Sequence, residues 1–168
     1  MRIIKLLGVL LLVISASVFP LFAYTSKTAT MKVVGVHETI VVLSTTDLDF
    51  GTFTQVSGIV KQDATITVKA SVGLPYNVTL DAGSSYDGQS RNIAAGASKI
   101  PYKILKPDGL AEWGDADFGG SYPKGTSVSD TGNGMDQTFL AHGELDASKA
   151  AGLPNDTYTD FVTVTIWY

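Results

Sequence analysis

Short runs in which apolar and polar residues alternate are the feature that most constrains the fold of this chain. The clearest run spans residues 159–168, where Val162, Val164, Ile166 and Tyr168 share one face and the residues between them share the other. A period of two is that of a β-strand with one buried and one solvated face. The 17 glycines and 6 prolines recur so often that few stretches can hold a long helix. The sequence therefore predicts an all-β protein.

Similar runs predict six further strands. They span residues 28–36, 39–44, 64–70, 76–80, 100–105 and 137–142. Turn-rich segments separate the later ones, at residues 81–90, 108–134 and 143–156, and residues 145–151 can form one helical turn within the last of these. Seven short strands separated by turn residues are typical of an antiparallel β-sandwich.

The first 23 residues have the layout of a secretory signal peptide. Arg2 and Lys5 precede an apolar core at residues 6–14, and polar sequence follows Ala23. That core is much shorter than the about 20 apolar residues that a membrane-spanning helix needs. We therefore expect residues 1–23 to be removed and the mature chain to be exported.

The composition excludes several classes of function. Without Arg2 and Lys5, ten basic residues face sixteen acidic ones, a net charge of −6 that does not suit a nucleic-acid partner. The absence of cysteine excludes disulfides, thiolate metal sites and cysteine nucleophiles. His37 and His142 are the only histidines, and no G-x-S-x-G motif is present. We expect no catalytic residues, no metal site and no cofactor.

Three features in the loops allow a structural and a functional interpretation. Asp115 and Asp117 precede glycines but lack the full ligand spacing of a calcium loop, which favours an ordinary solvated loop. Trp113 and Tyr122 can form a platform for stacking sugars or can pack back onto the sandwich, and packing is favoured. Tyr158, near the start of the last strand, is placed like a tyrosine corner.

Six segments, none of them specific alone, occur in an order typical of one family. They are DLDFGTF at 47–53, ITVKASVGLPYNVTLDAG at 66–83, RNI at 91–93, PYKIL at 101–105, WGD at 113–115 and NDTYTDFVTVTIWY at 155–168. Together they resemble the spore coat U domain family, which includes subunits of archaic chaperone–usher pili. In the family the segment matching 91–93 is an Arg-containing loop. Many members also carry a cysteine pair, at the positions of Ile40 and Ala70 here, which this chain lacks.

The resemblance implies an incomplete immunoglobulin-like sandwich over residues 37–168 that lacks its final strand. Such a fold exposes a groove of core side chains and an unpaired strand edge, both of which favour aggregation. Residues 24–36 form a surplus apolar segment before this domain. We expect that segment to complete the sandwich of a neighbouring subunit, which is donor-strand complementation.

The alternation predicts which residues take part in the exchange. The donor side chains are those of Ala29, Met31, Val33 and Gly35. The acceptor groove, formed by the first and last core strands, is lined chiefly by Ile40, Val42, Val162, Val164 and Ile166. A head-to-tail contact of this kind does not close, so it builds a fibre of identical or sister subunits. By resemblance, a periplasmic chaperone first occupies the groove, an outer-membrane usher catalyses the exchange, and the fibre reaches the cell surface.

Two other interpretations remain open at this stage. The donor segment can fold back into its own domain, since Gly35 permits a turn before Ile40. The protein is then a self-complemented secreted monomer that binds a ligand such as carbohydrate through the loop of Trp113. A secreted hydrolase is the third possibility, although no nucleophile or metal set supports it.

Overall fold

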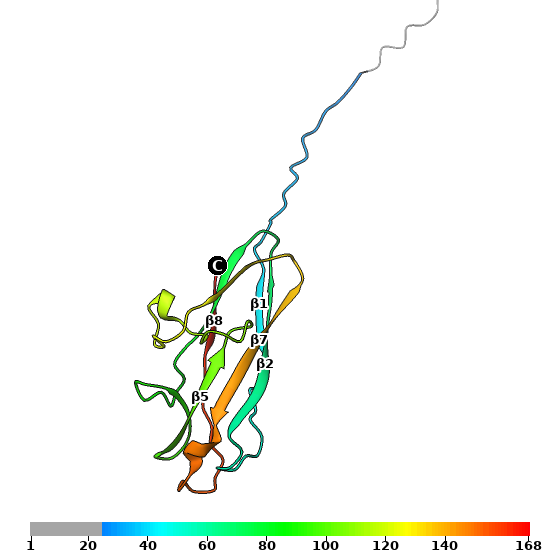
Figure 1. The fold of residues 1–168 in the computed structure, drawn as a ribbon. Helices are drawn as coiled ribbons and strands as arrows, with labels where there is room; N and C mark the ends of the chain where they lie inside the picture. The colour runs from blue at the N-terminus through cyan, green and yellow to red at the C-terminus, as the bar shows by residue number, and fades with distance from the viewer. Residues whose placement is uncertain (1–24) are drawn as a thin grey trace, which may run out of the picture. The chain divides into compact units, whose positions relative to one another are not determined.

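Eight strands, arranged in two antiparallel sheets, form the domain at residues 37–168 in the computed structural model, which describes residues 25–168 (Figure 1). The chain divides between Val36 and His37 into two units, of which the second holds the sandwich. The predicted signal peptide, residues 1–23, lies outside the described residues. The prediction of an all-β antiparallel sandwich of the immunoglobulin-like kind is confirmed.

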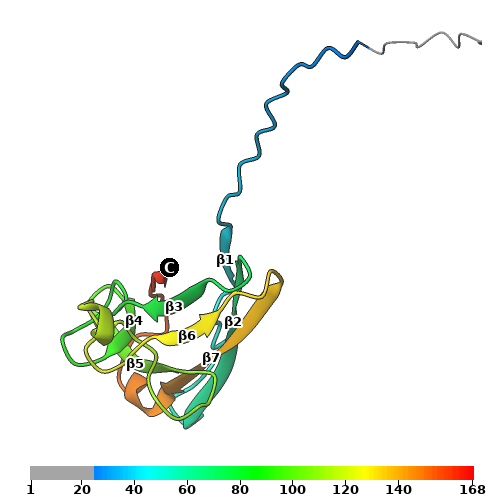
Figure 2. The same cartoon turned by 90° about the horizontal axis from the view of Figure 1, so that it is seen from above.

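The two sheets differ in size and pack face to face (Figure 2). The larger has the order β1 (Val41–Thr45), β2 (Ile59–Ala70), β7 (Asp136–Asp146), β5 (Ser98–Leu105) and β4 (Arg91–Ala95). The smaller has the order β6 (Val128–Thr131), β3 (Pro75–Leu80) and β8 (Val164–Trp167). Alternate residues of β2 (Ala64, Ile66, Val68 and Ala70) and of β3 (Tyr76, Val78 and Leu80) are buried between them. The period of two that is visible in the sequence therefore builds the core.

Two strands were not expected from the sequence, for different physical reasons. β4 contains Arg91–Ile93, which the family resemblance assigns to a loop, and its first three residues are all buried. A strand covered on both faces shows no alternation that would reveal it. β6 is short, polar and at the edge of its sheet, within the segment 108–134 that we expected to be a loop. Residues 25–40, which include the predicted strand 28–36, form no strand in this single chain.

Arg91 and Trp113 connect the two sheets through buried hydrogen bonds. The Arg91 side chain, fully buried on β4, donates to the carbonyl oxygens of Leu80 at 3.0 Å and Trp113 at 2.8 Å, and also to that of Asp81. Trp113 Nε1 donates to the Val78 carbonyl oxygen at 2.8 Å. Burial lowers the pKa of the Arg91 guanidinium, and these oxygens replace the water that it loses. One cation thereby ties β4 of the larger sheet to the end of β3 in the smaller sheet.

The loop features identified in the sequence have structural roles. Trp113 and Tyr122 are buried, and the Tyr122 ring lies under the Arg91 guanidinium at 3.8 Å, so neither aromatic offers a platform for sugars. Asp115 accepts hydrogen bonds from the amides of Ser121 and Tyr122. Asp117 accepts in the same way from the amide and hydroxyl of Ser127. The tyrosine corner is present, because the Tyr158 hydroxyl donates to the Pro154 carbonyl oxygen at 2.8 Å.

The short helices follow the loops rather than the core. η1 (Ala116–Phe118) lies in the Asp115 loop, and η2 (Ala147–Ala150) follows β7. η2 falls within residues 145–151, where the sequence predicts a helical turn, although β7 extends through Asp146 first. The predicted loop at 143–156 therefore begins later than expected.

Replacing Arg91 with methionine tests the connection between the sheets. The substitution keeps most of the apolar volume but leaves the three carbonyl oxygens without their donors. We expect it to lower the free energy of unfolding by about 3 kcal/mol or more, measured by urea denaturation. Lys69→Met, at an exposed position of β2, is the control and should change stability by less than about 0.5 kcal/mol. Equal effects of the two substitutions would contradict this role of Arg91.

Candidate acceptor groove

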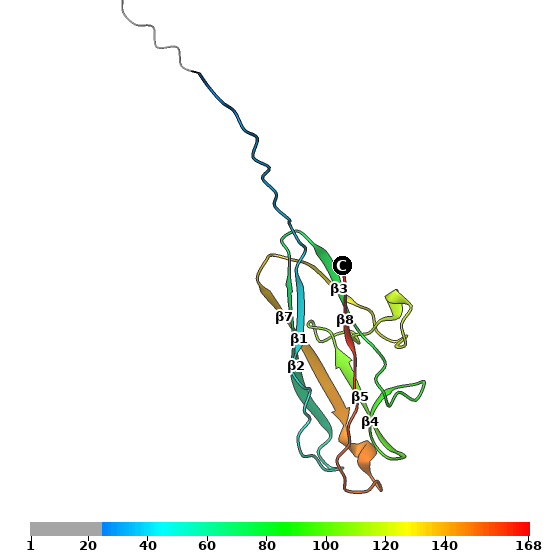
Figure 3. The same ribbon diagram turned by 180° about the vertical axis from the view of Figure 1, so that it is seen from behind.

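The sandwich is open along one side, between β1 and β8. Within residues 25–168, β1 is the terminal strand of the larger sheet and pairs only with β2, whereas β8 is the terminal strand of the smaller sheet and pairs only with β3. The two strands lie on the same side of the sandwich (Figure 3). The C-terminus lies at the end where β1 begins, so β1 and β8 run in opposite directions. Two strand edges without ladder partners therefore face the same opening.

A groove of about 580 Å³ lies at this opening and reaches down to the core. Its floor consists of side chains that also belong to the hydrophobic core, namely Ala64, Ile66, Leu80, Ile93, Tyr102, Ile104 and Ala141. One wall is formed by residues 45–51, which follow β1, and the other by residues 157–164, which lead into β8. The groove thus occupies the place where a further strand would cover the core between the two sheets.

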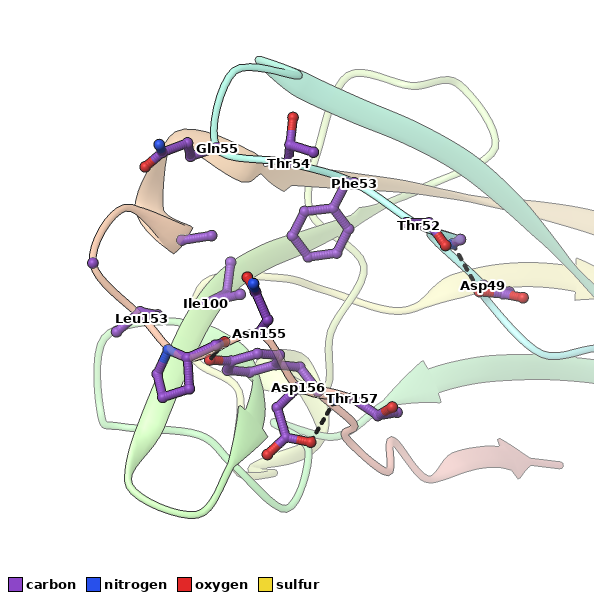
Figure 4. Close-up of a pocket in the computed structure, with 15 residues that line it drawn as sticks. Asp49, Thr52, Phe53, Thr54, Gln55, Ile100, Leu153, Asn155, Asp156 and Thr157 are labelled. Atoms are coloured by element: carbon purple, nitrogen blue, oxygen red, sulfur yellow. Dashed lines mark hydrogen bonds between the residues drawn. The ribbon is translucent and has the colours of Figure 1, made fainter.

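A second hollow of about 580 Å³ continues the groove beyond the ends of the strands (Figure 4). The two hollows share Asp49, Gly51, Phe53, Thr157 and Tyr158 in their linings. The apolar side chains of Phe53, Ile100 and Leu153 lie around the second hollow. Its outer end reaches Thr54 and Gln55. The two hollows together therefore form one continuous candidate surface.

Asp160 fixes the rim of the groove on the β8 side. Its carboxylate accepts hydrogen bonds from the Tyr102 hydroxyl at 2.7 Å, the Ser84 hydroxyl at 2.8 Å and the Ser85 amide at 2.8 Å. Burial, followed by the hydrogen bond to Asp160, raises the pKa of Tyr102, so the phenol remains protonated and remains a donor. Thr159 also exchanges two backbone hydrogen bonds with Ala94 of β4. The segment leading into β8 is thereby held while its outer edge stays open.

The predicted acceptor residues fall into two groups. Val162 and Val164 line the groove, and Ile166, opposite Val78 of β3, packs against the core. All three are half-buried. Val42 lies opposite the exposed Lys69 of β2 and therefore points away from the core. Ile40 precedes β1 and is 58% exposed.

The β1 residues that face the core are Val41 and Leu43 instead. They lie opposite Ala70 and Val68, both buried, and pack against the core. Residues 39–44 are nearly all apolar, so the sequence offers no alternation from which to choose the inward face. A shift of one residue along a strand turns the side chain to the other face. Val41 and Leu43, and not Val42, are therefore the residues of β1 that face the core.

The sequence also left important groove residues unrecognised. Leu48 and Phe50 in the DLDFGTF segment form part of one wall, and the Phe50 ring meets that of Tyr102 edge-on with centroids 6.0 Å apart. Gly143 of β7 makes room for them, because a Cβ there would lie 2.7 Å from the Leu48 methyl carbons and 3.0 Å from the Phe50 ring. The alternation of Leu48 and Phe50 with aspartates is the sequence feature from which their inward orientation could have been predicted.

The predicted donor residues belong to the other unit of the chain. Met31 is 83% exposed and Val33 is 86% exposed, and neither lies in a strand. Ala29 and Gly35 are exposed as well. One chain thus contains both a groove that reaches the core and an exposed apolar segment.

These features define a class of protein, an immunoglobulin-like sandwich with an open groove in place of one strand. The sequence matches the Spore Coat Protein U domain over residues 27–165, and the chain belongs to that family. The recognition made from sequence motifs is confirmed.

A solved structure supports the fold. The chain resembles part of a chaperone–tip adhesion subunit pre-assembly complex, CsuC–CsuE, from archaic chaperone–usher Csu pili of Acinetobacter baumannii. The TM-score is 0.57 at 21% identity, and the match covers 77% of this chain and 40% of that chain. The protein therefore spans less than half the length of that neighbour. No curated protein gave a significant sequence match.

The described residues hold neither a metal centre nor a membrane-spanning helix. Within residues 25–168, no group of three or more His, Asp or Glu side chains is arranged to bind a metal ion. No helix in the same range has the length and hydropathy required to cross a bilayer. His142 pairs through Nδ1 with Asp63 at 2.7 Å on the outer face of the larger sheet.

Replacing Gly83 with alanine tests the rim of the groove. Gly83 has φ +79°, and a Cβ there would collide with the Asp160 carboxylate. Gly88→Ala is a matched control, because its φ is +88° but open space surrounds it. Gly83→Ala should be about 1–3 kcal/mol more destabilising than Gly88→Ala in urea denaturation, the difference being the overpacking at Asp160. If the two substitutions cost the same, Asp160 does not hold the rim as described.

Proposed function

We propose that this protein is a structural subunit of a surface fibre and that its subunits are joined by donor-strand complementation. The observation that carries the proposal is the groove at the opening between β1 and β8, which has core side chains at its floor and lies between two strand edges without ladder partners among the described residues. Residues 24–36 supply the missing strand for a neighbouring subunit. The role is structural, with no reaction and no cofactor.

The energetic case rests on the surfaces that the exchange removes from water. Inserting the segment pairs the free backbone groups of β8 and β1 and covers the floor of the groove. Burying Met31 and Val33 contributes about 1.5–3 kcal/mol each, since both are almost fully exposed beforehand. Ala29 and Gly35 add less apolar area, but their small size suits the narrower parts of a groove. The contact resembles the packing of a strand in a core rather than a surface encounter.

The assembly partners follow from the family and from the structural neighbour. That neighbour is a complex between a chaperone and a pilus subunit, which supports a periplasmic chaperone as the first occupant of the groove here. An outer-membrane usher then exchanges the chaperone for the next subunit's donor segment. The product is a fibre of this subunit or of sister subunits, exported to the cell surface.

The geometry of the linker favours exchange between subunits over self-insertion. The stretch from Gly35 to Ile40 spans at most about 18 Å when fully extended. A segment folded back through this connection would form a hairpin with β1, and it would run antiparallel to β1 and therefore parallel to β8. Self-insertion requires the chain to reverse its direction within these few residues, whereas a segment from another subunit is under no such constraint. In the proposed fibre, that segment runs antiparallel to β8 and parallel to β1. The self-complemented monomer also loses its proposed ligand site, since Trp113 and Tyr122 are buried.

Replacing Met31 with aspartate tests the donor assignment. A carboxylate inserted into the apolar groove would be desolvated without a partner, so the variant should not polymerise. Its groove remains intact, so it should still co-purify with the chaperone when the two are expressed together. Fibres are scored by electron microscopy and by size-exclusion chromatography.

Thr30→Asp is the matched control for this test. It introduces the same charge one position earlier, where the side chain points away from the groove in the proposed register. It should assemble nearly as well as the wild type. Normal fibres from Met31→Asp would show that the donor residues are assigned incorrectly, and loss of fibres in both variants would show that charge rather than register is responsible.

A further inference from the structure

Three exposed apolar residues gather at the end of the domain where β1 begins. The Ser71 amide donates to the Ile40 carbonyl oxygen at 3.0 Å, and the Ile40 amide donates to Ser71 Oγ at 2.9 Å. Val72 follows in the same turn and is 79% exposed. Met135, 67% exposed, lies in the neighbouring turn, whose Gly134 amide donates to the Ala70 carbonyl oxygen at 3.0 Å. We call the pair Val72 and Met135 the apolar tip; Ile40 lies beside it.

The two turns that carry the tip are held rigidly together. The Gly73 amide donates to the Gly132 carbonyl oxygen and the Gly132 amide to that of Leu74, both at 2.8 Å. A Cβ at Gly134 would lie 3.1 Å from a Val72 methyl carbon, so this methyl already packs against the other turn. Two large apolar side chains are thus presented to solvent on an ordered surface, where side-chain and loop ordering would cost little on binding.

A complementary apolar residue lies at the opposite end of the domain. Val56 is 86% exposed in the turn 54–57, whose neighbours Thr54 and Gln55 line the outer end of the groove. The 12 residues of β2 separate this turn from the tip (Figure 1), a distance of about 40 Å along the strand. One end of each subunit therefore carries the tip, and the other carries Val56 beside the mouth of the groove.

We propose that the apolar tip of one subunit packs against the Val56 turn of the next, as a second contact at every joint of the fibre. The inference rests on the proposed donor-strand exchange. A donor segment antiparallel to β8 leaves the groove where the chain enters β8, which is the end at Val56. The connection to Ile40, about 18 Å at most, then holds the donor subunit's tip close to that mouth.

The covalent connection between the inserted donor segment and its own domain explains how so small a contact can form. Two or three side chains bury far less area than a stable interface between free proteins needs. Once the donor segment is inserted, however, the tip and the Val56 turn meet at an effective concentration in the millimolar range or above. A contact too weak to join free subunits can then be formed for most of the time and can limit bending at the joint.

The methionines of the chain allow both contacts to be tested in one experiment. Outside the signal peptide the sequence has only Met31, in the donor segment, and Met135, in the tip. Purified fibres and monomers of the full mature chain are treated with hydrogen peroxide, and sulfoxide at each methionine is followed by mass spectrometry. The monomers carry an isotope-labelled synthetic peptide of residues 25–36 in the groove, which completes the fold without adding a second subunit.

Oxidation of both methionines should be about fivefold or more slower in fibres than in the complemented monomers, because susceptibility follows exposure. Protection of Met31 with Met135 as reactive as in the monomer overturns the tip contact and leaves the proposed function standing. Reactive Met31 in fibres overturns the donor-strand proposal itself, and the tip contact with it.

A charged substitution in the tip provides the second measurement. Val72→Asp should raise Met135 oxidation in fibres toward the monomer rate while Met31 stays protected. Leu110→Asp, at an 85% exposed position in a turn away from both ends, should change neither rate. If Met135 stays protected in Val72→Asp fibres, its protection comes from another contact and the proposal is wrong. Loss of fibres in Val72→Asp alone, with the complemented monomer still folded, supports the contact.

Discussion

The unpaired edges of β1 and β8 are the constraint on which the rest of this structure depends. Backbone N–H and C=O groups need partners, and core side chains need cover from water. Among the described residues, the outer edges of β1 and β8 have no ladder partner, and the groove beside them has core residues such as Ile66, Leu80 and Ile104 at its floor. A lone chain in this state is prone to aggregation. The requirement for another strand is therefore built into the subunit, and it is the physical basis of the proposed fibre.

A sandwich that lacks a strand along one side needs other contacts to keep its two sheets together. No disulfide is available in this cysteine-free chain, and the positions where many family members carry a cysteine pair are Ile40 and Ala70. The hydrogen bonds of Arg91 and Trp113 cross between the sheets instead, and Asp160 fixes the rim through Tyr102 and Ser84. These polar contacts are directional, so they fix the position of one sheet relative to the other. Apolar burial has no preferred direction and does not fix that position.

The two ends of the domain have a different role in the proposed fibre from its open side. In the proposed fibre, the groove accepts the strand of a neighbouring subunit, whereas the short connection from Gly35 to Ile40 determines how closely the two subunits approach. Exposed apolar residues at both ends, Val72 and Met135 at one and Val56 at the other, lie where that approach brings them together. Strength and stiffness of the fibre can then arise from separate contacts, one through strand pairing and one through the tip.

The sequence alone determined the fold class, most of the strands and the family, because a period of two records which residues face the core. It also placed Val162, Val164 and Ile166 on the face that packs against the core, since their alternation with polar residues is visible along residues 159–168. Only the tertiary structure decided the inward face of β1, because its residues are nearly all apolar and show no alternation. It also decided the existence of β4, whose first three residues are all buried, and of β6, which is short and polar and whose partner β3 is distant in sequence. It also showed that Trp113 is buried next to Arg91 and that Leu48 and Phe50 form part of a wall of the groove. Burial and contacts of this kind depend on how the two sheets pack, which no local sequence pattern records.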